Sequence, residues 1–229
     1  MNYCEVQKIA KQTMTFITSQ IKVGMSLLEL RQLAESKMNK LGATSFWYWD
    51  IGAFVFSGEE TTLSVSGKHY QTADKLINAD DIITVDLSPQ VNEFWGDYAR
   101  TIIVENGVVI NDIIKISNPE WKSGLLMEDK LHSELLSFAK PETTFEELYF
   151  HMNEFIVSNG YINLDFMGNL GHSIVTKKDD RIYIEKGNNA TLGSVKYFTF
   201  EPHIAVIGSK FGFKKENIYH FKNSKLTEI

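Results

Sequence analysis

Two acidic residues interrupt apolar, strand-like sequence in the middle of the chain. Asp86 follows the run Ile-Ile-Thr-Val at 82–85, and Asp97 precedes the run Thr-Ile-Ile-Val at 101–104. These β-branched runs predict two strands, and the turn-forming residues between them predict a hairpin-like connection. In an antiparallel pair the two carboxylates would face each other, with about 5 Å between their Cβ atoms. Buried carboxylates so close must share a proton, pair with Arg or Lys, or bind a cation, and we pursue the cation.

Two helices are expected before this acidic stretch. Apolar residues recur at helical spacing through residues 6–21, which predicts an amphipathic helix ended by Gly24. Ser26 followed by Glu29 has the pattern of a capping box. A second helix is therefore expected from this box to Gly42.

An aromatic segment follows the second predicted helix. Residues 46–56 predict a pair of strands around Gly52, and residues 57–72 are expected to form a loop. The aromatic residues at 46–49, together with Trp95, could line a substrate pocket. Aromatic runs in strands more often belong to the core.

The second half of the chain repeats part of the first. Residues 22–42 align without a gap on residues 140–160, and Thr144 and Glu147 take the places of the first capping box. Similar capped helices also arise by chance. Taken at face value, the repeat implies two αβ halves related by approximate two-fold symmetry, with a site at the seam.

Three more candidate ligands lie in strand-like settings of the second half. His172 occurs in GNLGHSIV, Glu201 in FTFEPHI and Glu216 in FGFKKENIYHF. A lone acidic residue among apolar neighbours is usually an edge-strand residue that faces water. A succession of Asp, Asp, His, Glu and Glu in such settings favours a metal site instead.

In order and context, these segments resemble those of the pita-bread metallopeptidases, the superfamily of methionine aminopeptidases, Xaa-Pro aminopeptidases, prolidases and creatinases. DYARTIIV is similar to the family strand D-x-x-R/K-T-x-x-V, GHSI to the segment around its ligand histidine, FTFEP to FTIEP, and FKKEN to the segment with its last glutamate. The resemblance covers nearly the whole chain and is closest to Xaa-Pro dipeptidase-like members, without their N-terminal domain. It implies an α+β pita-bread fold in a single domain, residues 1–229, with halves of about 1–118 and 119–229 around a curved, mainly antiparallel sheet.

The resemblance also implies a ligand set for two divalent ions. Asp86 would bind one ion and His172 the other, Asp97 and Glu216 would bridge both, and Glu201 would complete the shell of the second ion. Four carboxylates and one imidazole suit Mn²⁺, Fe²⁺ or Co²⁺ and tolerate Zn²⁺. Ions roughly 3.5 to 4 Å apart would hold a bridging water and polarise a scissile carbonyl, with Glu201 accepting the water's proton.

Two further histidines are candidates for catalysis. His69 falls where prolidase-like members have the histidine of their LPHG segment, and there it would hydrogen-bond the substrate or the developing oxyanion. The alternative is a loop histidine in water. Family peptidases have a second histidine seven residues after the ligand histidine, but this chain has Asp179 there. His203 could supply the missing imidazole or simply cap the site.

Arg100 and two histidines in helical sequence are expected to have supporting or structural roles. Arg100 is expected to pair with a site carboxylate and support it. His132 and His151 fall in helical sequence, where surface or packing positions are expected.

Composition restricts the partners. With 229 residues and a net charge of −6, the chain lacks the basic surface that nucleic-acid phosphates require. Cys4 is the only cysteine, and no apolar run is long enough for a membrane span, so we expect a cytoplasmic protein. The expected partner is a short peptide or another small molecule, with a homodimer as a candidate assembly.

Three functions remain open at this stage. The first is a two-metal peptidase acting on short peptides, most like an Xaa-Pro dipeptidase or aminopeptidase. The second is a metal-dependent enzyme of the same fold with a non-peptide substrate, for which the lost second histidine argues. The third is a catalytically silent binding homologue, against which the retention of all the ligand types counts.

Overall fold

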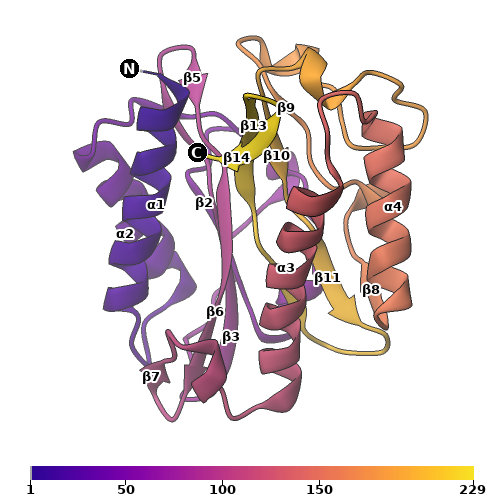
Figure 1. Ribbon diagram of the computed structural model, residues 1–229. Helices are drawn as coiled ribbons and strands as arrows, with labels where there is room; N and C mark the ends of the chain where they lie inside the picture. Colours follow the sequence, from indigo (N-terminus) through magenta and orange to yellow (C-terminus); the bar gives the residue numbers. More distant parts are fainter. Residues whose placement is uncertain (1) are drawn as a thin grey trace.

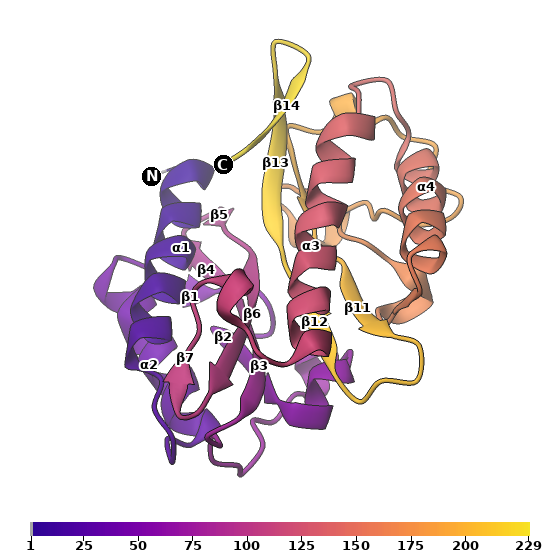
Figure 2. The same cartoon turned by 60° about the horizontal axis from the view of Figure 1, so that its bottom comes forward.

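The chain combines α-helices with antiparallel sheets, which confirms the α+β class. The structure is a computed structural model that describes residues 2–229. In both Figure 1 and Figure 2, one helix pair lies on one side of the molecule and a second pair on the other, with long strands between them. The helices are α1 (Tyr3–Gln20), α2 (Leu27–Lys40), α3 (Pro119–Phe138) and α4 (Phe145–Ser158).

The strands form four short antiparallel sheets within residues 2–229. The sheet orders are β1-β4-β5, β2-β3-β6-β7, β12-β11-β8 and β14-β13-β10-β9. The strands are β1 (Ser45–Phe46), β2 (Ala53–Ser57), β3 (Asp81–Leu87), β4 (Pro89–Val91), β5 (Phe94–Trp95), β6 (Tyr98–Glu105), β7 (Val108–Val109), β8 (Tyr161–Asn163), β9 (Ser173–Ile174), β10 (Tyr197–Phe200), β11 (His203–Val206), β12 (Gly212–Lys214), β13 (Asn217–Lys222) and β14 (Lys225–Glu228).

The repeated capping boxes are confirmed atom for atom. At the start of α2, Glu29 N donates to Ser26 Oγ over 3.1 Å, and Ser26 N donates to Glu29 Oε2 over 2.7 Å. Thr144 and Glu147 make the same two bonds, at the same distances, at the start of α4. Each N-cap residue also forms an isolated antiparallel bridge, to Leu76 for Ser26 and to Thr191 for Thr144. The repeat is therefore more than a resemblance between two helices, because the chain that follows each helix returns to its start.

The predicted pairing of the two acidic residues across a strand ladder is wrong. Asp86 on β3 pairs with Ala99 on β6, and Asp97 lies just before β6 begins. The reason is that residues between the two strands do not form a simple turn. They form their own hairpin of β4 and β5, which pairs with β1 in a separate sheet.

The aromatic segment also differs from its prediction. Two strands do form around Gly52, but β1 pairs with β4 and β2 pairs with β3, so they do not pair with each other. Gly52 is required here because a Cβ would lie 2.6 Å from Glu35 Cγ and 2.7 Å from the Phe46 ring. Residues 57–72, predicted as a loop, contain two 3₁₀ turns, η1 (Gly58–Thr62) and η2 (Gly67–His69).

Two large apolar clusters make up most of the core of the described residues, beside two smaller ones. One cluster joins α1 and α2 to the β2-β3-β6 sheet, and the other joins α3 and α4 to the strands of the second half. Ile82 and Ile103 belong to the second cluster although they lie in the first half of the chain. The cores therefore meet at the β3–β6 pair. The division into two halves within one domain stays a prediction.

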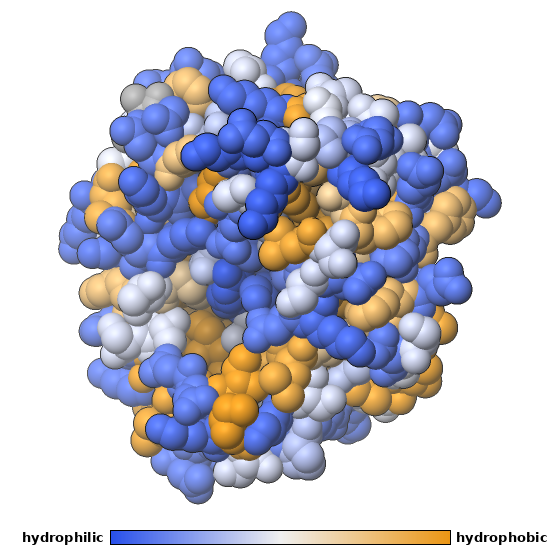
Figure 3. Space-filling view, in the orientation of Figure 1, coloured by the Kyte–Doolittle hydropathy of each residue, from blue (hydrophilic) through white to orange (hydrophobic). Residues whose placement is uncertain are grey.

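The start of α1 and the end of β14 lie close together in both ribbon views, and Lys11 Nζ on α1 is 2.7 Å from Glu228 Oε1 on β14. On the face shown in Figure 3, hydrophilic residues predominate and hydrophobic residues occur in small groups. Within the described residues, no helix is both long enough and apolar enough to cross a membrane.

Candidate metal centre

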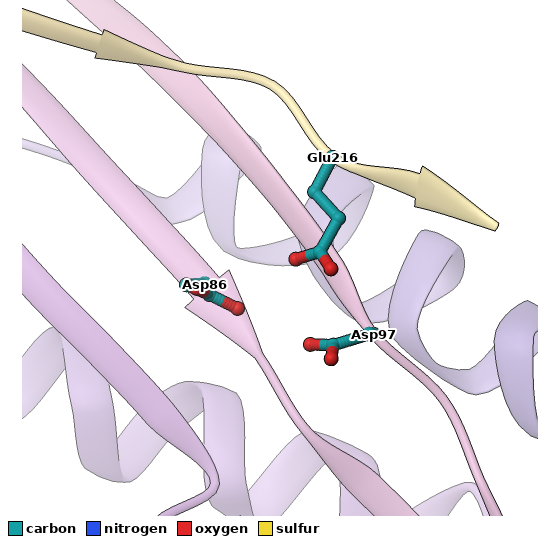
Figure 4. A group of neighbouring side chains, drawn as sticks. All are labelled: Asp86, Asp97 and Glu216. Atoms are coloured by element: carbon teal, nitrogen blue, oxygen red, sulfur yellow. The ribbon is translucent and has the colours of Figure 1, made fainter. Parts of the chain in front are cut away.

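Three carboxylates from distant parts of the chain converge at the end of the β3–β6 pair. Figure 4 shows Asp86, Asp97 and Glu216 turned toward one another. One ligand oxygen from each lies within 4.8 Å of the others. Two of these side chains are almost completely buried, at 4% exposure for Asp97 and 0% for Glu216. Such a buried cluster of negative charge needs protons or cations.

Asp97 is held in place by a residue of the first helix. Its backbone N–H donates to Gln7 Oε1 over 3.0 Å, and Gln7 Nε2 donates to the Asp97 carbonyl over 2.7 Å. Gln7 is fully buried. Gly96 allows this approach, because a Cβ there would lie 2.8 Å from Gln7 Oε1. Both polar groups of the Asp97 backbone are thus satisfied, and its side chain stays free for the cluster.

His172 presents one ring nitrogen to the cluster. Its Nδ1–H donates to the Ser173 carbonyl over 3.1 Å, which leaves the lone pair of Nε2 free. Nε2 lies 3.7 Å from Asp97 Oδ2 and 3.7 Å from Glu201 Oε1. Burial lowers the pKa of His172 to about 3, so the ring is neutral, as a metal ligand must be.

The backbone at His172 depends on the glycine before it. Gly171 has φ +137°, and a Cβ there would lie 2.4 Å from the Thr199 carbonyl oxygen. On the other side, His172 N donates to Thr199 Oγ1 over 3.0 Å, and Thr199 N donates to the His172 carbonyl over 2.7 Å. Close contact with β10 therefore sets the direction of the imidazole.

The ammonium group of Lys214, which the sequence analysis did not single out, lies in the cluster beside Glu201. Lys214 Nζ lies 2.6 Å from Asp86 Oδ2 and 3.4 Å from Glu201 Oε2. Burial alone would lower the pKa of Lys214, but Asp86 and Glu201 raise it well above its ordinary value. Burial raises the pKa of Glu201 to about 7, against the opposing charge of Lys214.

Glu216 gives the strongest indication that this cluster can hold a cation. Neither of its carboxylate oxygens has a hydrogen-bond partner among residues 2–229. Burial, and then the neighbouring Asp97 and Glu201, raise its pKa well above the ordinary range. Burial and the neighbouring Asp86 do the same for Asp97. The donor set of four carboxylates and one neutral imidazole fits hard or borderline divalent cations such as Mn²⁺, Fe²⁺ and Co²⁺.

The cluster opens into a cavity of about 570 Å³. One wall is aromatic and includes Trp47, Tyr48 and Phe54, whose neighbouring rings touch, together with Phe56. The lining also includes the polar side chains of Asp86, Asp97, His172, Glu201 and Lys214. Of the aromatic residues predicted to line a pocket, Trp47 and Tyr48 do so, whereas Phe46, Trp49 and Trp95 are not among the lining residues. Trp47, only 6% exposed, also packs in the core.

The other predicted residues lie in different places. His203 lines the cavity, but its Nε2–H donates to the Thr61 carbonyl over 2.6 Å. His69 is exposed at η2 and is not among the cavity-lining residues. Asp179 is exposed in the turn Lys178–Asp180 and is also outside the lining.

The prediction for Arg100 is wrong. It does not pair with a site carboxylate, but donates from Nη1 to the Glu216 carbonyl over 2.8 Å and from Nη2 to Asn217 Oδ1 over 2.7 Å. Its guanidinium stacks 3.9 Å from the centre of the Tyr98 ring. Arg100 thus acts on the backbone of a candidate ligand.

Sequence reasoning missed three residues at this site. Gln7 gave no signal, because a glutamine in an amphipathic helix is expected at the surface. Lys214 had a weak signal, since it stands two residues before Glu216 and shares its side of an extended chain. Arg181 lines the cavity, with its guanidinium 4.7 Å from the centre of the Trp47 ring.

Comparisons with known proteins agree with this fold. A family model described as metallopeptidase family M24 matches residues 2–223. The X-Pro aminopeptidase of Thermotoga maritima superposes with a TM-score of 0.80 at 23% identity, over 99% of this chain and 59% of that one. The prolidase of Pyrococcus furiosus superposes with a TM-score of 0.78 at 21% identity, over 98% and 61%.

A third similar structure is the Xaa-Pro dipeptidase of Bacillus anthracis, with a TM-score of 0.78 at 20% identity, over 99% of this chain and 58% of that one. At these identities the similarity shows the fold alone, and it confirms the predicted pita-bread arrangement. The chain spans about three fifths of the length of these proteins. A search of curated proteins found no match.

Proposed function

Because the chain belongs to metallopeptidase family M24, we propose that it is a metal-dependent peptidase that hydrolyses short peptides with two divalent ions bound. The observation that carries the proposal is the buried meeting of Asp86, Asp97 and Glu216, with both Glu216 oxygens lacking any partner among the described residues. Structural residues seldom leave a buried carboxylate in this state.

We assign the ligands as the resemblance implied. Asp86, Asp97, His172, Glu201 and Glu216 would together hold the ions. The 3.7 Å distances from His172 Nε2 to Asp97 and Glu201 support a common ion for these three, since ligand bonds of about 2.1 Å separate neighbouring donors by such distances. When bound, the ions would lower the pKa of a water and polarise the substrate carbonyl.

The chain's own groups supply the remaining steps. Glu201 lines the cavity, so its carboxylate can accept a proton and pass it to the leaving amine. The aromatic wall can hold an apolar side chain or a proline ring against the site and exclude water from it. A cavity of about 570 Å³ has the size of a small-ligand site and suits short peptides. Xaa-Pro peptides are the first candidates, because the similar solved structures include an X-Pro aminopeptidase and an Xaa-Pro dipeptidase.

A second candidate is a metal enzyme of the same fold with a non-peptide substrate. Asp179, which stands where family peptidases have a second histidine, is exposed outside the cavity lining. The His203 imidazole does not offer a free Nε2 in its place, since this nitrogen is bonded to the Thr61 carbonyl. A silent binding homologue is the third candidate.

Metal content separates the silent homologue from the two metal-enzyme candidates. The protein is reconstituted with Mn²⁺ or Co²⁺, desalted and analysed for bound metal, together with Asp97→Ala and the exposed control Asp179→Ala. We expect up to two ions in the wild type and in the control, and their loss in Asp97→Ala. A wild type with stoichiometry near zero would favour the silent homologue.

Turnover then identifies the substrate class. Metal-loaded protein is assayed with Xaa-Pro dipeptides and with Met-Xaa peptides. We expect cleavage of Xaa-Pro substrates, with loss of activity in Asp97→Ala. A metal-loaded sample that cleaves neither set would favour the non-peptide enzyme.

A further inference from the structure

The candidate ligand Glu216 lies in a joint between two sheets, outside any strand. Residues 215 and 216 connect β12, which pairs with β11, to β13, which pairs with β10 and β14. The backbone of Glu216 is therefore not held by the hydrogen bonds of a β-ladder. Other groups must satisfy its polar atoms, because buried backbone N–H and C=O groups are rarely left unpaired.

Residues of β6 satisfy one side of the joint. Glu216 N donates to the Ala99 carbonyl over 3.0 Å, and Arg100 donates to the Glu216 carbonyl. Thr101 Oγ1 donates to the Lys214 carbonyl over 3.1 Å and accepts from Lys214 N over 2.8 Å. These bonds fix the joint to the strand pair that carries Asp86 and Asp97.

The remaining carbonyl, that of Lys215, turns to the opposite side and meets helix α3. His132 Nε2 lies 3.0 Å from this oxygen, and His132 Nδ1 lies 2.7 Å from the Tyr219 hydroxyl. Since a carbonyl can only accept, Nε2 carries the hydrogen, and Nδ1 accepts from Tyr219. His132 is 4% exposed, and burial lowers its pKa well below the ordinary value, so it stays neutral in this tautomer.

A second contact from the same helix confirms that α3 holds the joint. Lys215 Nζ lies 2.5 Å from Asp129 Oδ1, three residues before His132 on α3. Lys214 and Glu216 point to the cluster, while Lys215 points away from it to the helix. The alternation of an extended chain thus couples the position of α3 to the position of the Glu216 carboxylate.

We propose that His132 is a positioning residue for the metal centre: its Nε2–H bond to the Lys215 carbonyl holds the joint so that Glu216 faces Asp86 and Asp97. This inference rests on the proposed metal-binding function. His132 would act on metal affinity without contact to an ion, in the way that hydrogen bonds to ligand-bearing groups do in other metal sites.

Two substitutions of His132 separate positioning from packing. In His132→Gln the side-chain amide can reach the place of Nε2 and donate to Lys215. In His132→Asn the shorter amide reaches only the place of Nδ1, so the Lys215 carbonyl loses its partner. Tyr219→Phe removes the other hydrogen bond and leaves the bond to Lys215 intact. His151→Leu, at a half-buried histidine on α4 bonded to Glu134, is a control for loss of a helix histidine.

The dissociation constant for Mn²⁺ is measured by calorimetry, and the visible spectrum of bound Co²⁺ reports the ligand geometry. For His132→Asn we expect a dissociation constant for Mn²⁺ roughly 10- to 100-fold higher, as for other groups that orient metal ligands. We also expect an altered Co²⁺ spectrum. The Mn²⁺ dissociation constant is expected to stay within about threefold of the wild-type value in His132→Gln, Tyr219→Phe and His151→Leu, because each keeps a donor to the Lys215 carbonyl. Denaturant unfolding of the metal-free variants shows how far stability has changed in each.

An unchanged metal affinity in a folded His132→Asn protein would overturn this inference and leave the proposed function intact. An equal loss in Tyr219→Phe would also overturn it, because packing of the pair would then be the cause. A wild type that binds neither Mn²⁺ nor Co²⁺ would overturn the proposed function and the inference together.

Discussion

Lys214 Nζ lies 2.6 Å from Asp86 Oδ2, so an ammonium group stands inside the acidic cluster. Both side chains are mostly buried, at 19% and 22% exposure. The ammonium offsets part of the repulsion among the carboxylates when no divalent ion is bound. It also competes with an ion for Asp86.

We expect Lys214→Met to destabilise the metal-free protein by about 2 kcal/mol, somewhat less than for a fully buried pair, because Asp86 loses its partner. Saturating Mn²⁺ should remove most of this deficit, since a bound cation replaces the lost charge. Denaturant unfolding with and without Mn²⁺ measures both effects. Lys75→Met, which removes a more exposed ion pair with Glu60 outside the cavity lining, should cost under about 1 kcal/mol with no dependence on Mn²⁺. Equal behaviour of the two variants would contradict this account.

Metal binding should release protons and weaken as the pH falls from 8 to 6. Burial raises the pKa of Glu201 to about 7, and raises the pKa values of Asp97 and Glu216 well above the ordinary range. In the metal-free protein these groups bind protons that an ion must displace, so a lower pH favours the protonated, ion-free state. His172, with a pKa of about 3, is already neutral and releases none. Calorimetry in two buffers of different ionisation enthalpy counts the protons, and zero release would show that the carboxylates are ionised beforehand.

Gly171→Ala should impair both folding and metal binding. The alanine would have to adopt φ +137°, and its Cβ would lie 2.4 Å from the Thr199 carbonyl oxygen, so the backbone at His172 must shift. Gly208→Ala is the matched control, because Gly208 also has a positive φ, +80°, but a Cβ there meets nothing within 4 Å. The control should lose about 1 to 2 kcal/mol of stability and bind Mn²⁺ normally. Gly171→Ala should lose more stability and bind Mn²⁺ more weakly, and normal Mn²⁺ binding would argue against His172 as a ligand.

His69→Ala should retain its bound metal, because His69 is exposed at η2 and lies outside the cavity lining. Its predicted contact with substrate would appear as a lower kcat/KM at unchanged metal content. Parallel metal analysis and steady-state kinetics on an Xaa-Pro dipeptide measure the two quantities. Loss of metal in this variant would make His69 a ligand or a structural residue instead.

The capping boxes at Ser26 and Thr144 could be predicted from the sequence, because a cap depends on residues three positions apart. The pairing of Asp86 with Asp97 could not, because register depends on where the intervening segment finds its own partner, here β1. Arg100 lies beside the site as expected, but it donates to the Glu216 carbonyl and not to a carboxylate. Sequence does not specify which of these two acceptors a guanidinium meets.

By itself, the sequence determined that buried-type segments carry acidic residues and a histidine, and that two halves repeat a capped helix, because these are local properties of residue type and spacing. Only the tertiary structure decided which of these side chains meet. It brought Glu216 to Asp86 and Asp97 through a joint between two sheets, set Lys214 among them, and left His69 in solvent. Those outcomes follow from long-range packing and from the pairing of buried polar groups, which no short stretch of chain specifies.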